Sequence, residues 1–334
     1  MLLSLQLLGT LVLILLAAEI FTNALEHLGE RIGISEGVTG SLFAAVGTAM
    51  PESIVPLVAV LAGGADAHVN SEIGVGAILG APLMLSTLSV CVMALSVLKR
   101  RGWAGHLRPE RSGLRRDLTF FLIAYGIGVA ALFVPETLKT VRAGAVVLLL
   151  LTYFFYVMLT LRVSTQLVEE GHGTEAHGAL FLSRAGLPTN LVTIGLQVLI
   201  GLATLVGGAK GFVYCVTGLS GSIGLSPLVL SLLIVPVATE LPEKVNSVIW
   251  IRRGKDTLAF GNITGAMVFQ GSLLPALGIA ITPWHPTPEV LTGIAVTLLA
   301  GVWMWSLAQR GALRVWHLAL NGVVYAAYVA TMLA

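Results

Sequence analysis

Four apolar runs, each close to the length that crosses a lipid bilayer, most constrain how this chain can fold. They are Leu2–Phe21, Leu118–Val134, Val141–Leu161 and Leu291–Leu307, and a membrane helix needs about 20 such residues. Charged residues make up only 11% of the chain and hydrophobic residues 56%, whereas a soluble domain is about 25% charged. No soluble core could bury so much apolar surface, so we expect an all-α integral membrane protein.

The whole chain divides into about ten predicted spans. The first run has no basic segment before it and is long enough to cross a bilayer, so we interpret it as a retained helix and not as a cleaved signal. The spans are residues 2–21, 37–62, 71–98, 118–134, 141–161, 190–214, 226–250, 257–281, 289–307 and 315–333.

The positive charges predict the orientation of these spans. Seven Lys and Arg residues lie in the linker 99–116, three in 252–255, and two more, Arg310 and Arg314, in the turn 308–314. The loops 63–70, 216–225 and 282–288 contain none. Basic loops usually face the cytoplasm, and each of these follows an odd-numbered span. We therefore predict a multi-pass protein of the cell membrane with both termini outside the cytoplasm. Lys139 and Arg142, in the loop after the fourth span, do not fit this pattern.

A repeat relates the two halves of the chain. The sequence IGIS at 32–35 recurs as IGLS at 223–226, and GTAMPES at 47–53 recurs as ATELPEK at 238–244, both at an offset of 191 residues. Farther on, GVGAILGA (74–81) resembles AFGNITGA (259–266) at an offset of 185. A repeat of five spans must enter the membrane in the opposite direction the second time, as in many secondary transporters. The predicted units are a first five-helix repeat (1–161), a cytoplasmic linker (162–189) and a second, inverted repeat (190–334).

The paired motif places acids where burial in lipid is expensive. Glu52 and Glu243 each follow a proline directly, and a carboxylate inside a membrane indicates function by default. Proline has no N–H, so it leaves the carbonyl four residues earlier without its helical partner. A threonine lies four residues before each glutamate, on the same face of a helix. The candidate ligands of the two motifs are therefore Glu52, Thr48 and the carbonyl of Gly47, with Glu243, Thr239 and the carbonyl of Ala238.

These donors are all hard oxygen atoms, which suit Ca²⁺, Na⁺ or H⁺ and do not suit soft metals. Two such clusters, brought together at mid-membrane by the repeat, would form a cation site. The alternative is a pair of proline kinks whose glutamates are protonated and paired with neighbours.

The two motifs, each followed by a glycine-rich span, resemble the two α-repeats of the sodium/calcium exchanger family of cation/calcium antiporters. The pattern typical of that family reads G-T-S-x-P-E and later G-N-x-x-G-S. The resemblance covers the first three spans of each half. It implies ten spans, transport of cations by alternating access as an outer helix pair of each half slides against the core, and ion binding by Thr48, Glu52, Thr239 and Glu243.

Several positions depart from the family pattern. Ala49 and Glu240 replace the serines that follow the two threonines, and Ala81 and Ala266 replace the serines of the later motif. Where the family has Asn or Asp four residues on, this chain has Leu85 in one half and Gln270 in the other. Side-chain oxygens are lost and one carboxylate is added. We therefore add Glu240 and Gln270 to the candidate ligands.

The remaining oxygen atoms still suffice for one Ca²⁺, which binds about six to eight of them, but the additional Na⁺ sites of the family are in question. Three carboxylates in one apolar cluster repel one another, which also favours coupling to H⁺. Lys244 lies four residues after Glu240 and could neutralise it, or could act as a built-in cation.

The sequence thus favours a secondary antiporter that exchanges Ca²⁺ for Na⁺ or H⁺. A cation channel or uniporter on the same scaffold, and a non-transporting member that has lost its ion sites, stay open as alternatives. There is no H-E-x-x-H, phosphate-binding loop or nucleophile elbow, so we predict no enzymatic activity. We expect no cofactor and no nucleic acid, only inorganic cations and membrane lipid as partners. The sequence does not determine the oligomeric state, and a monomer is one of the possibilities.

Overall fold

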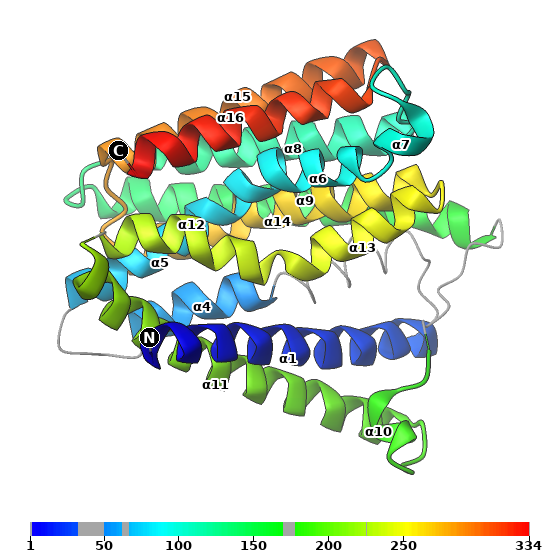
Figure 1. Cartoon of the computed structure of the whole chain (residues 1–334), viewed down its shortest axis with the longest axis horizontal. Coiled ribbons are helices and arrows are strands. Elements are labelled where there is room, and N and C mark those ends of the chain that lie inside the picture. Colours follow the sequence, from blue (N-terminus) through cyan, green and yellow to red (C-terminus); the bar gives the residue numbers. More distant parts are fainter. Residues whose placement is uncertain (1, 33–49, 62–66, 170–177, 225, 334) are drawn as a thin grey trace.

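The computed structural model describes residues 2–32, 50–61, 67–169, 178–224 and 226–333, and these residues form helices and no β-strand (Figure 1). The first half contains α1 (Leu2–Ile32), α4 (Met50–Leu61), α5 (Ala67–Met84), a π-helical turn η2 (Leu85–Ser89), α6 (Val90–Leu95), α7 (Leu98–Arg101), α8 (Arg111–Leu132) and α9 (Lys139–Glu169). The second half contains α10 (Phe181–Arg184), α11 (Leu191–Ile223), α12 (Pro227–Thr239), α13 (Leu241–Arg252), α14 (Asp256–Ile281), α15 (Pro288–Arg310) and α16 (Val315–Leu333).

Within the described residues, seven helices are long and apolar enough to cross a membrane. They are Leu5–Leu25, His68–Leu95, Lys139–Arg162, Leu191–Leu219, Asp256–Ile281, Pro288–Arg310 and Val315–Leu333. Of the other three predicted spans, 37–62 lies partly outside the described residues, and 118–134 begins inside α8 and extends two residues beyond its end at Leu132. The span 226–250 is divided between α12 and α13. The all-helical class is confirmed, whereas the count of ten spans stays a prediction.

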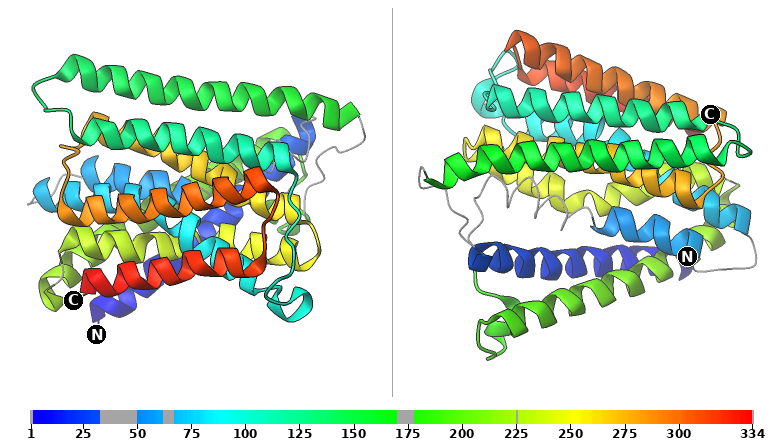
Figure 2. Two further views of the ribbon diagram at one scale, coloured as in Figure 1. Left: turned by 90° about the horizontal axis from the view of Figure 1, so that it is seen from above. Right: turned by 180° about the vertical axis from the view of Figure 1, so that it is seen from behind.

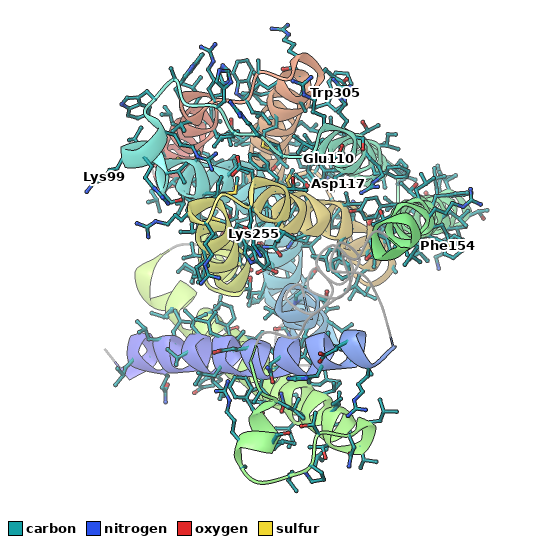
Figure 3. The ribbon with its side chains drawn as sticks, turned by 90° about the vertical axis from the view of Figure 1, so that its right-hand side faces the viewer. Lys99, Glu110, Asp117, Phe154, Lys255 and Trp305 are labelled. Carbon is teal, nitrogen blue, oxygen red and sulfur yellow. The ribbon has the colours of Figure 1, made fainter. Side chains whose placement is uncertain are left out.

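Helix α9 presents apolar side chains to the outside of the bundle. Figure 3 shows Phe154 pointing away from the other helices, and this side chain is exposed together with Val147, Leu148, Leu150, Leu151, Phe155 and Leu159. Such a surface is unfavourable in water and favourable against lipid tails. The helix continues to Glu169, so the predicted linker 162–189 begins as a helix.

Helices α1 and α11 form a layer of their own along one side of the molecule (Figures 1 and 2). Glycines of α11 allow the two backbones to approach closely, as small residues do in membrane helix pairs. A Cβ atom at Gly201 would lie 2.9 Å from the Cβ of Phe21, and one at Gly208 would lie 2.8 Å from Cγ1 of Ile14. This pair combines one helix from each half of the chain.

Helix α5 lies between the helices that carry the two motifs. A Cβ at Gly74 would lie 2.8 Å from Val60 of α4, one at Gly76 would lie 2.7 Å from the carbonyl oxygen of Leu228 of α12, and one at Gly80 would lie 2.6 Å from that of Leu232. The glycines of GVGAILGA therefore allow α5 to pack closely against both α4 and α12. At Gly261 of the equivalent GNITGA, a Cβ would meet nothing within 4 Å.

The three basic loops lie together at one end of the molecule. The guanidinium of Arg100 donates to the carbonyl of Arg252, that of Arg115 donates to the carbonyls of Ala308 and Gln309, and a bridge joins His106 to Arg314. Figure 3 looks onto this end, where Lys99, Glu110 and Lys255 lie. Helix α1 begins and α16 ends at the opposite end (Figure 1). The basic loops thus share one side, as the charge pattern predicts.

Arg142, which does not fit the charge pattern, has a structural role. Its side chain is only 7% exposed and donates to the carbonyl oxygens of Pro283 (2.9 Å), Ile279 (3.2 Å) and Thr282 (3.2 Å) at the C-terminal end of α14. Carbonyls at a helix C-terminus carry partial negative charge and have no partners within the helix. A cation at this position is therefore favoured by α14, whichever side of the membrane it faces.

We expect the change Arg142→Met to destabilise the protein by about 3 kcal/mol, because the charged hydrogen bonds are lost and buried carbonyl groups remain. Thermal unfolding in detergent measures this loss. The control is Arg310→Met, because Arg310 is exposed and a substitution there should cost no more than about 0.5 kcal/mol. Equal melting temperatures for the two variants would contradict this role of Arg142.

Candidate functional site

The second motif lies where the helical span is interrupted. Helix α12 ends at Thr239 and α13 begins at Leu241, so Glu240 stands between them with φ −81° and ψ 2°. Pro236 lies inside α12 and Pro242 lies in the first turn of α13. A proline at 242 cannot donate to the carbonyl of Ala238, so the expected free carbonyl lies directly at this interruption. Figure 1 shows α12 and α13 following one another across the middle of the molecule.

Glu240 and Gln270 contact each other in the interior. Both side chains are completely buried, and Nε2 of Gln270 donates to Oε1 of Glu240 over 2.7 Å. Among the described residues, Oε2 of Glu240 and Oε1 of Gln270 have no hydrogen-bond donor. Buried oxygens are rarely left without a partner. The two substitutions that depart from the family pattern thus meet and present two oxygen atoms that a cation could bind.

Glu243 lies one turn farther along, in the first turn of α13, and is also completely buried. Its backbone carbonyl accepts a hydrogen bond of 3.1 Å from Nδ2 of Asn262, which also donates to Oγ of Ser247 over 3.0 Å. Asn262 and Ser247 are 2% and 0% exposed. Their contacts link α14 to α13, the helix that carries Glu243, and neither residue was among the predicted site residues. Gly261 and Asn262 match the first two letters of the family pattern G-N-x-x-G-S, and this match was the sequence signal that could have identified Asn262.

Thr239 and Lys244 have backbone partners. The hydroxyl of Thr239 donates to the carbonyl of Val235 over 3.1 Å, which leaves its lone pairs available. The ammonium group of Lys244 donates to the carbonyls of Pro236 (3.2 Å) and Val237 (3.4 Å) near the interruption. Lys244 and Glu243 are both close enough to act electrostatically on Glu240. The cluster therefore contains a cation that partly balances its two carboxylates.

The first motif can be followed only in part. Gly47 and Thr48 lie outside the described residues, and Glu52 is described only as part of the backbone of α4, near its first residue. Within the described part of the chain, no three His, Cys, Asp or Glu side chains lie together as a metal site. The structure thus brings together Thr239, Glu240, Glu243 and Gln270, while the contribution of the first half stays a prediction.

A further buried acid was missing from the predicted site. Asp117 of α8 is 3% exposed, accepts a hydrogen bond of 2.8 Å from the hydroxyl of Thr264 on α14, and pairs with Arg116 over 3.3 Å. The guanidinium of Arg116 also lies over the ring of Tyr156 on α9. Figure 3 shows Asp117 inside the bundle near the basic end. The acid thus links α8 to α14, its neighbour Arg116 extends the contact to α9, and these partners satisfy the carboxylate without an ion.

A hollow of about 670 Å³ opens at the end of the molecule opposite the basic loops. Val60 of α4, Val75 of α5 and Leu228 of α12 form part of its wall, and Glu72, Glu136 and two histidines add polar groups. The hollow therefore lies at the ends of the helices that carry the two motifs.

Comparisons with known proteins agree with this architecture. The chain matches the sodium/calcium exchanger protein family over residues 2–162 and 194–334. It is 24% identical over 328 residues to the inner membrane protein YrbG of Escherichia coli (strain K12), which covers 88% of this chain and 93% of that protein. It is 25% identical over 280 residues to the putative antiporter CaxA of Alkalimonas amylolytica, covering 82% and 79%.

Solved structures share the fold at low sequence identity. The H⁺/Ca²⁺ exchanger CAX superposes with a TM-score of 0.73 at 14% identity, over 99% of this chain and 86% of that one. The sodium–calcium exchanger NCX_Mj superposes with a TM-score of 0.61 at 18% identity, over 98% of each chain. Because the family match covers most of the sequence, this protein belongs to the sodium/calcium exchanger family.

Proposed function

We propose that this protein is a secondary active antiporter that exchanges Ca²⁺ for Na⁺ or H⁺ across the cell membrane. The observation that carries the proposal is the pair of completely buried carboxyl groups, Glu240 and Glu243, at the interruption between α12 and α13. Buried carboxylates are costly unless a cation or donors balance them. Family membership and the names of the relatives, an H⁺/Ca²⁺ exchanger and a sodium–calcium exchanger among them, support cation exchange.

The proposed ligands are oxygen atoms from both halves of the chain. Glu243 and Glu52 would provide the central carboxylates, Glu240 and Gln270 would add the two free oxygen atoms of their pair, and the hydroxyl groups and carbonyls of the two motifs would complete the shell. Together these are Glu52, Thr48, Gly47, Glu243, Thr239, Ala238, Glu240 and Gln270. This set fits a hard cation such as Ca²⁺. Asn262 would hold the Glu243 turn in place.

The proposed architecture is ten spans in two inverted repeats, residues 1–161 and 190–334, joined by the linker 162–189. The two long helices α1 and α11 would be equivalent, as would α4 with its preceding segment and the α12–α13 pair. In this topology the basic loops face the cytoplasm and both termini face outward. The gathering of the basic loops at one end supports the orientation.

Alternating access would require one part of the molecule to move against the rest. The α1–α11 layer, held together by close glycine contacts, is suited to move as one unit against the remaining helices. Cations would reach the site from the outer side through the hollow beside α4, α5 and α12. A low-dielectric path lined by Glu72 and Glu136 would attract cations.

The experiment uses purified protein in sealed liposomes. We expect Ca²⁺ uptake that depends on an imposed Na⁺ gradient or on an imposed pH gradient and that ceases when the gradient is removed. The gradient that drives uptake identifies the counter-ion. Flux that continues without either gradient would indicate a channel, and no Ca²⁺ flux under either gradient would contradict the proposal.

A further inference from the structure

A second hollow, of about 630 Å³, lies at the basic end of the molecule. It lies between the linker that contains α7 and the turn that joins α13 to α14. Arg100 and Arg101 line one side of it, and Arg252 and Arg253 line the other. Val97 and Ile251 add apolar wall toward the bundle. Four arginine residues thus line one cavity at the end of membrane helices.

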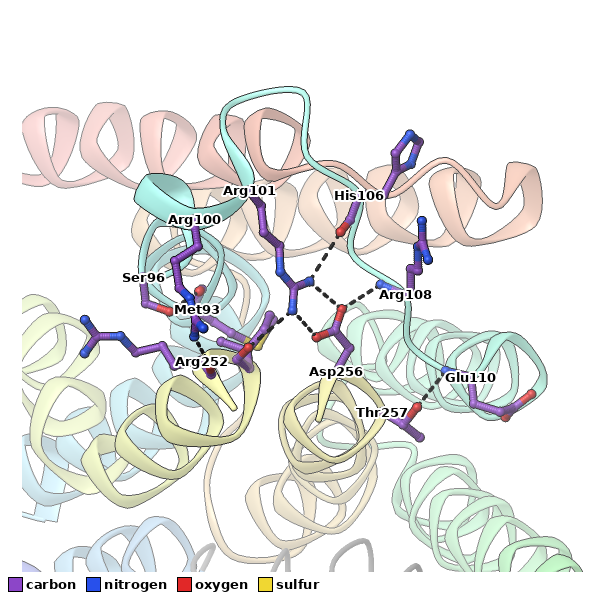
Figure 4. Close-up of polar contacts among 11 residues, drawn as sticks. Met93, Ser96, Arg100, Arg101, His106, Arg108, Glu110, Arg252, Asp256 and Thr257 are labelled. Atoms are coloured by element: carbon purple, nitrogen blue, oxygen red, sulfur yellow. Dashed lines mark hydrogen bonds and ion pairs between the residues drawn. The ribbon is translucent and has the colours of Figure 1, made fainter. Parts of the chain in front are cut away.

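One of these four charges is already balanced. The guanidinium of Arg101 makes a two-pronged contact with the carboxylate of Asp256 over 2.6 and 2.7 Å (Figure 4). Among the described residues, no carboxylate forms an ion pair with Arg100, Arg252 or Arg253. Three positive charges therefore remain around the hollow without a counter-charge.

The backbone carbonyls at the C-terminal end of α13 would not repel an anion bound in this hollow. A helix C-terminus carries partial negative charge through its free carbonyls, but here each has a donor. Arg100 donates to the carbonyl of Arg252 (Figure 4), and Arg101 donates to that of Ile251. The N–H of Lys255 donates to the carbonyl of Trp250. The positive side chains are thus the dominant charge in the hollow.

We propose that this hollow binds the phosphate group of an anionic lipid headgroup. Arginine forks match phosphate oxygens in pairs, and basic residues at the end of membrane helices attract anionic lipids. The apolar wall would lie beside the first carbons of the lipid. The site goes beyond cation exchange and does not depend on it. A bound headgroup would also hold the linker to the turn after α13, and so raise the melting temperature.

The test is titration of the detergent-solubilised protein with phosphatidylglycerol, with phosphatidylcholine and with inorganic phosphate, with bound lipid counted by native mass spectrometry. We expect wild-type protein to retain phosphatidylglycerol and to melt at a higher temperature with it. The double variant Arg252→Gln/Arg253→Gln should bind about 25-fold more weakly, at about fivefold for each arginine removed. Its backbone carbonyls, which Arg100 needs, are unchanged.

The matched control is Lys99→Gln/Arg310→Gln, which removes two charges from the same end but none from the hollow. This control should bind lipid as the wild type does. Equal loss in both double variants would contradict a defined site and indicate diffuse attraction. Undiminished binding by the Arg252/Arg253 variant would overturn the proposal. If inorganic phosphate binds as tightly as phosphatidylglycerol, the hollow is a site for free phosphate and the proposal of a lipid headgroup is wrong. The single variant Arg253→Lys, which keeps the charge, provides a folded reference if the double variant is unstable.

Discussion

The change Glu243→Gln is expected to abolish cation exchange while the protein stays folded. Glutamine keeps the size of the side chain but removes the negative charge that would balance the transported cation. Removing one partner of a buried charge pair costs about 3 kcal/mol or more, which corresponds to at least about 100-fold weaker cation binding. Because the neutral amide is cheaper to bury in the absence of an ion, the melting temperature of the ion-free variant should stay the same or rise.

The expected loss of cation exchange and the unchanged or higher melting temperature distinguish loss of the ion site from loss of the fold. A lower rate of exchange together with an unchanged or higher melting temperature would support Glu243 as a ligand. The control is Glu30→Gln, since Glu30 is an exposed carboxylate on α1 and this variant should exchange cations as the wild type does. Normal exchange by the Glu243→Gln protein would remove Glu243 from the site.

The change Gly80→Leu is expected to prevent the protein from folding. A Cβ at this position would lie 2.6 Å from both the carbonyl oxygen of Leu232 and Cγ of Pro236. Neither can turn aside, because one belongs to the backbone and the other to a proline ring. Overpacking of a core usually costs about 1–3 kcal/mol, and separating α5 from α12 would lose their remaining contacts as well. We expect little folded protein by size-exclusion chromatography.

Gly144→Leu is the matched control for this change. Gly144 also lies inside a long helix, α9, but a Cβ there would meet nothing within 4 Å. Leucine also favours the helix over glycine by several tenths of a kcal/mol. This variant should yield as much folded protein as the wild type, and Gly80→Ala should fall between the two. Equal yields from Gly80→Leu and Gly144→Leu would contradict the close approach of α5 and α12.

The family, the helical class and the gathering of basic loops could be predicted because each depends on a pattern that is local in sequence. Apolar length determines which segments cross a membrane, and the repeated Pro-Glu motif marks the two places where a backbone carbonyl loses its helical partner. The contact between Glu240 and Gln270 could not be predicted. The sequence names both as departures from the family pattern, but they are 30 residues apart, and only the packing of α13 on α14 brings them together.

Other residues were missed because their partners are distant in sequence. Asn262 reaches the backbone of Glu243, and Asp117 reaches Thr264 across 147 residues. Arg142 does not fit the charge pattern because a residue count cannot distinguish a solvated cation from one that binds the end of α14. Contacts between residues of different helices depend on how each helix is rotated about its axis. The apolar pattern of a membrane helix specifies this rotation poorly.

The central claim is that the movement of Ca²⁺ is coupled obligatorily to that of a counter-ion. The most direct measurement loads liposomes containing the protein with Ca²⁺ and follows Na⁺ and pH inside them while Ca²⁺ leaves down its gradient. The account predicts that one counter-ion enters against its own gradient, that Ca²⁺ efflux stops when this ion is withheld, and that Glu243→Gln abolishes both movements. Ca²⁺ efflux that proceeds with neither Na⁺ nor H⁺ entering would contradict it.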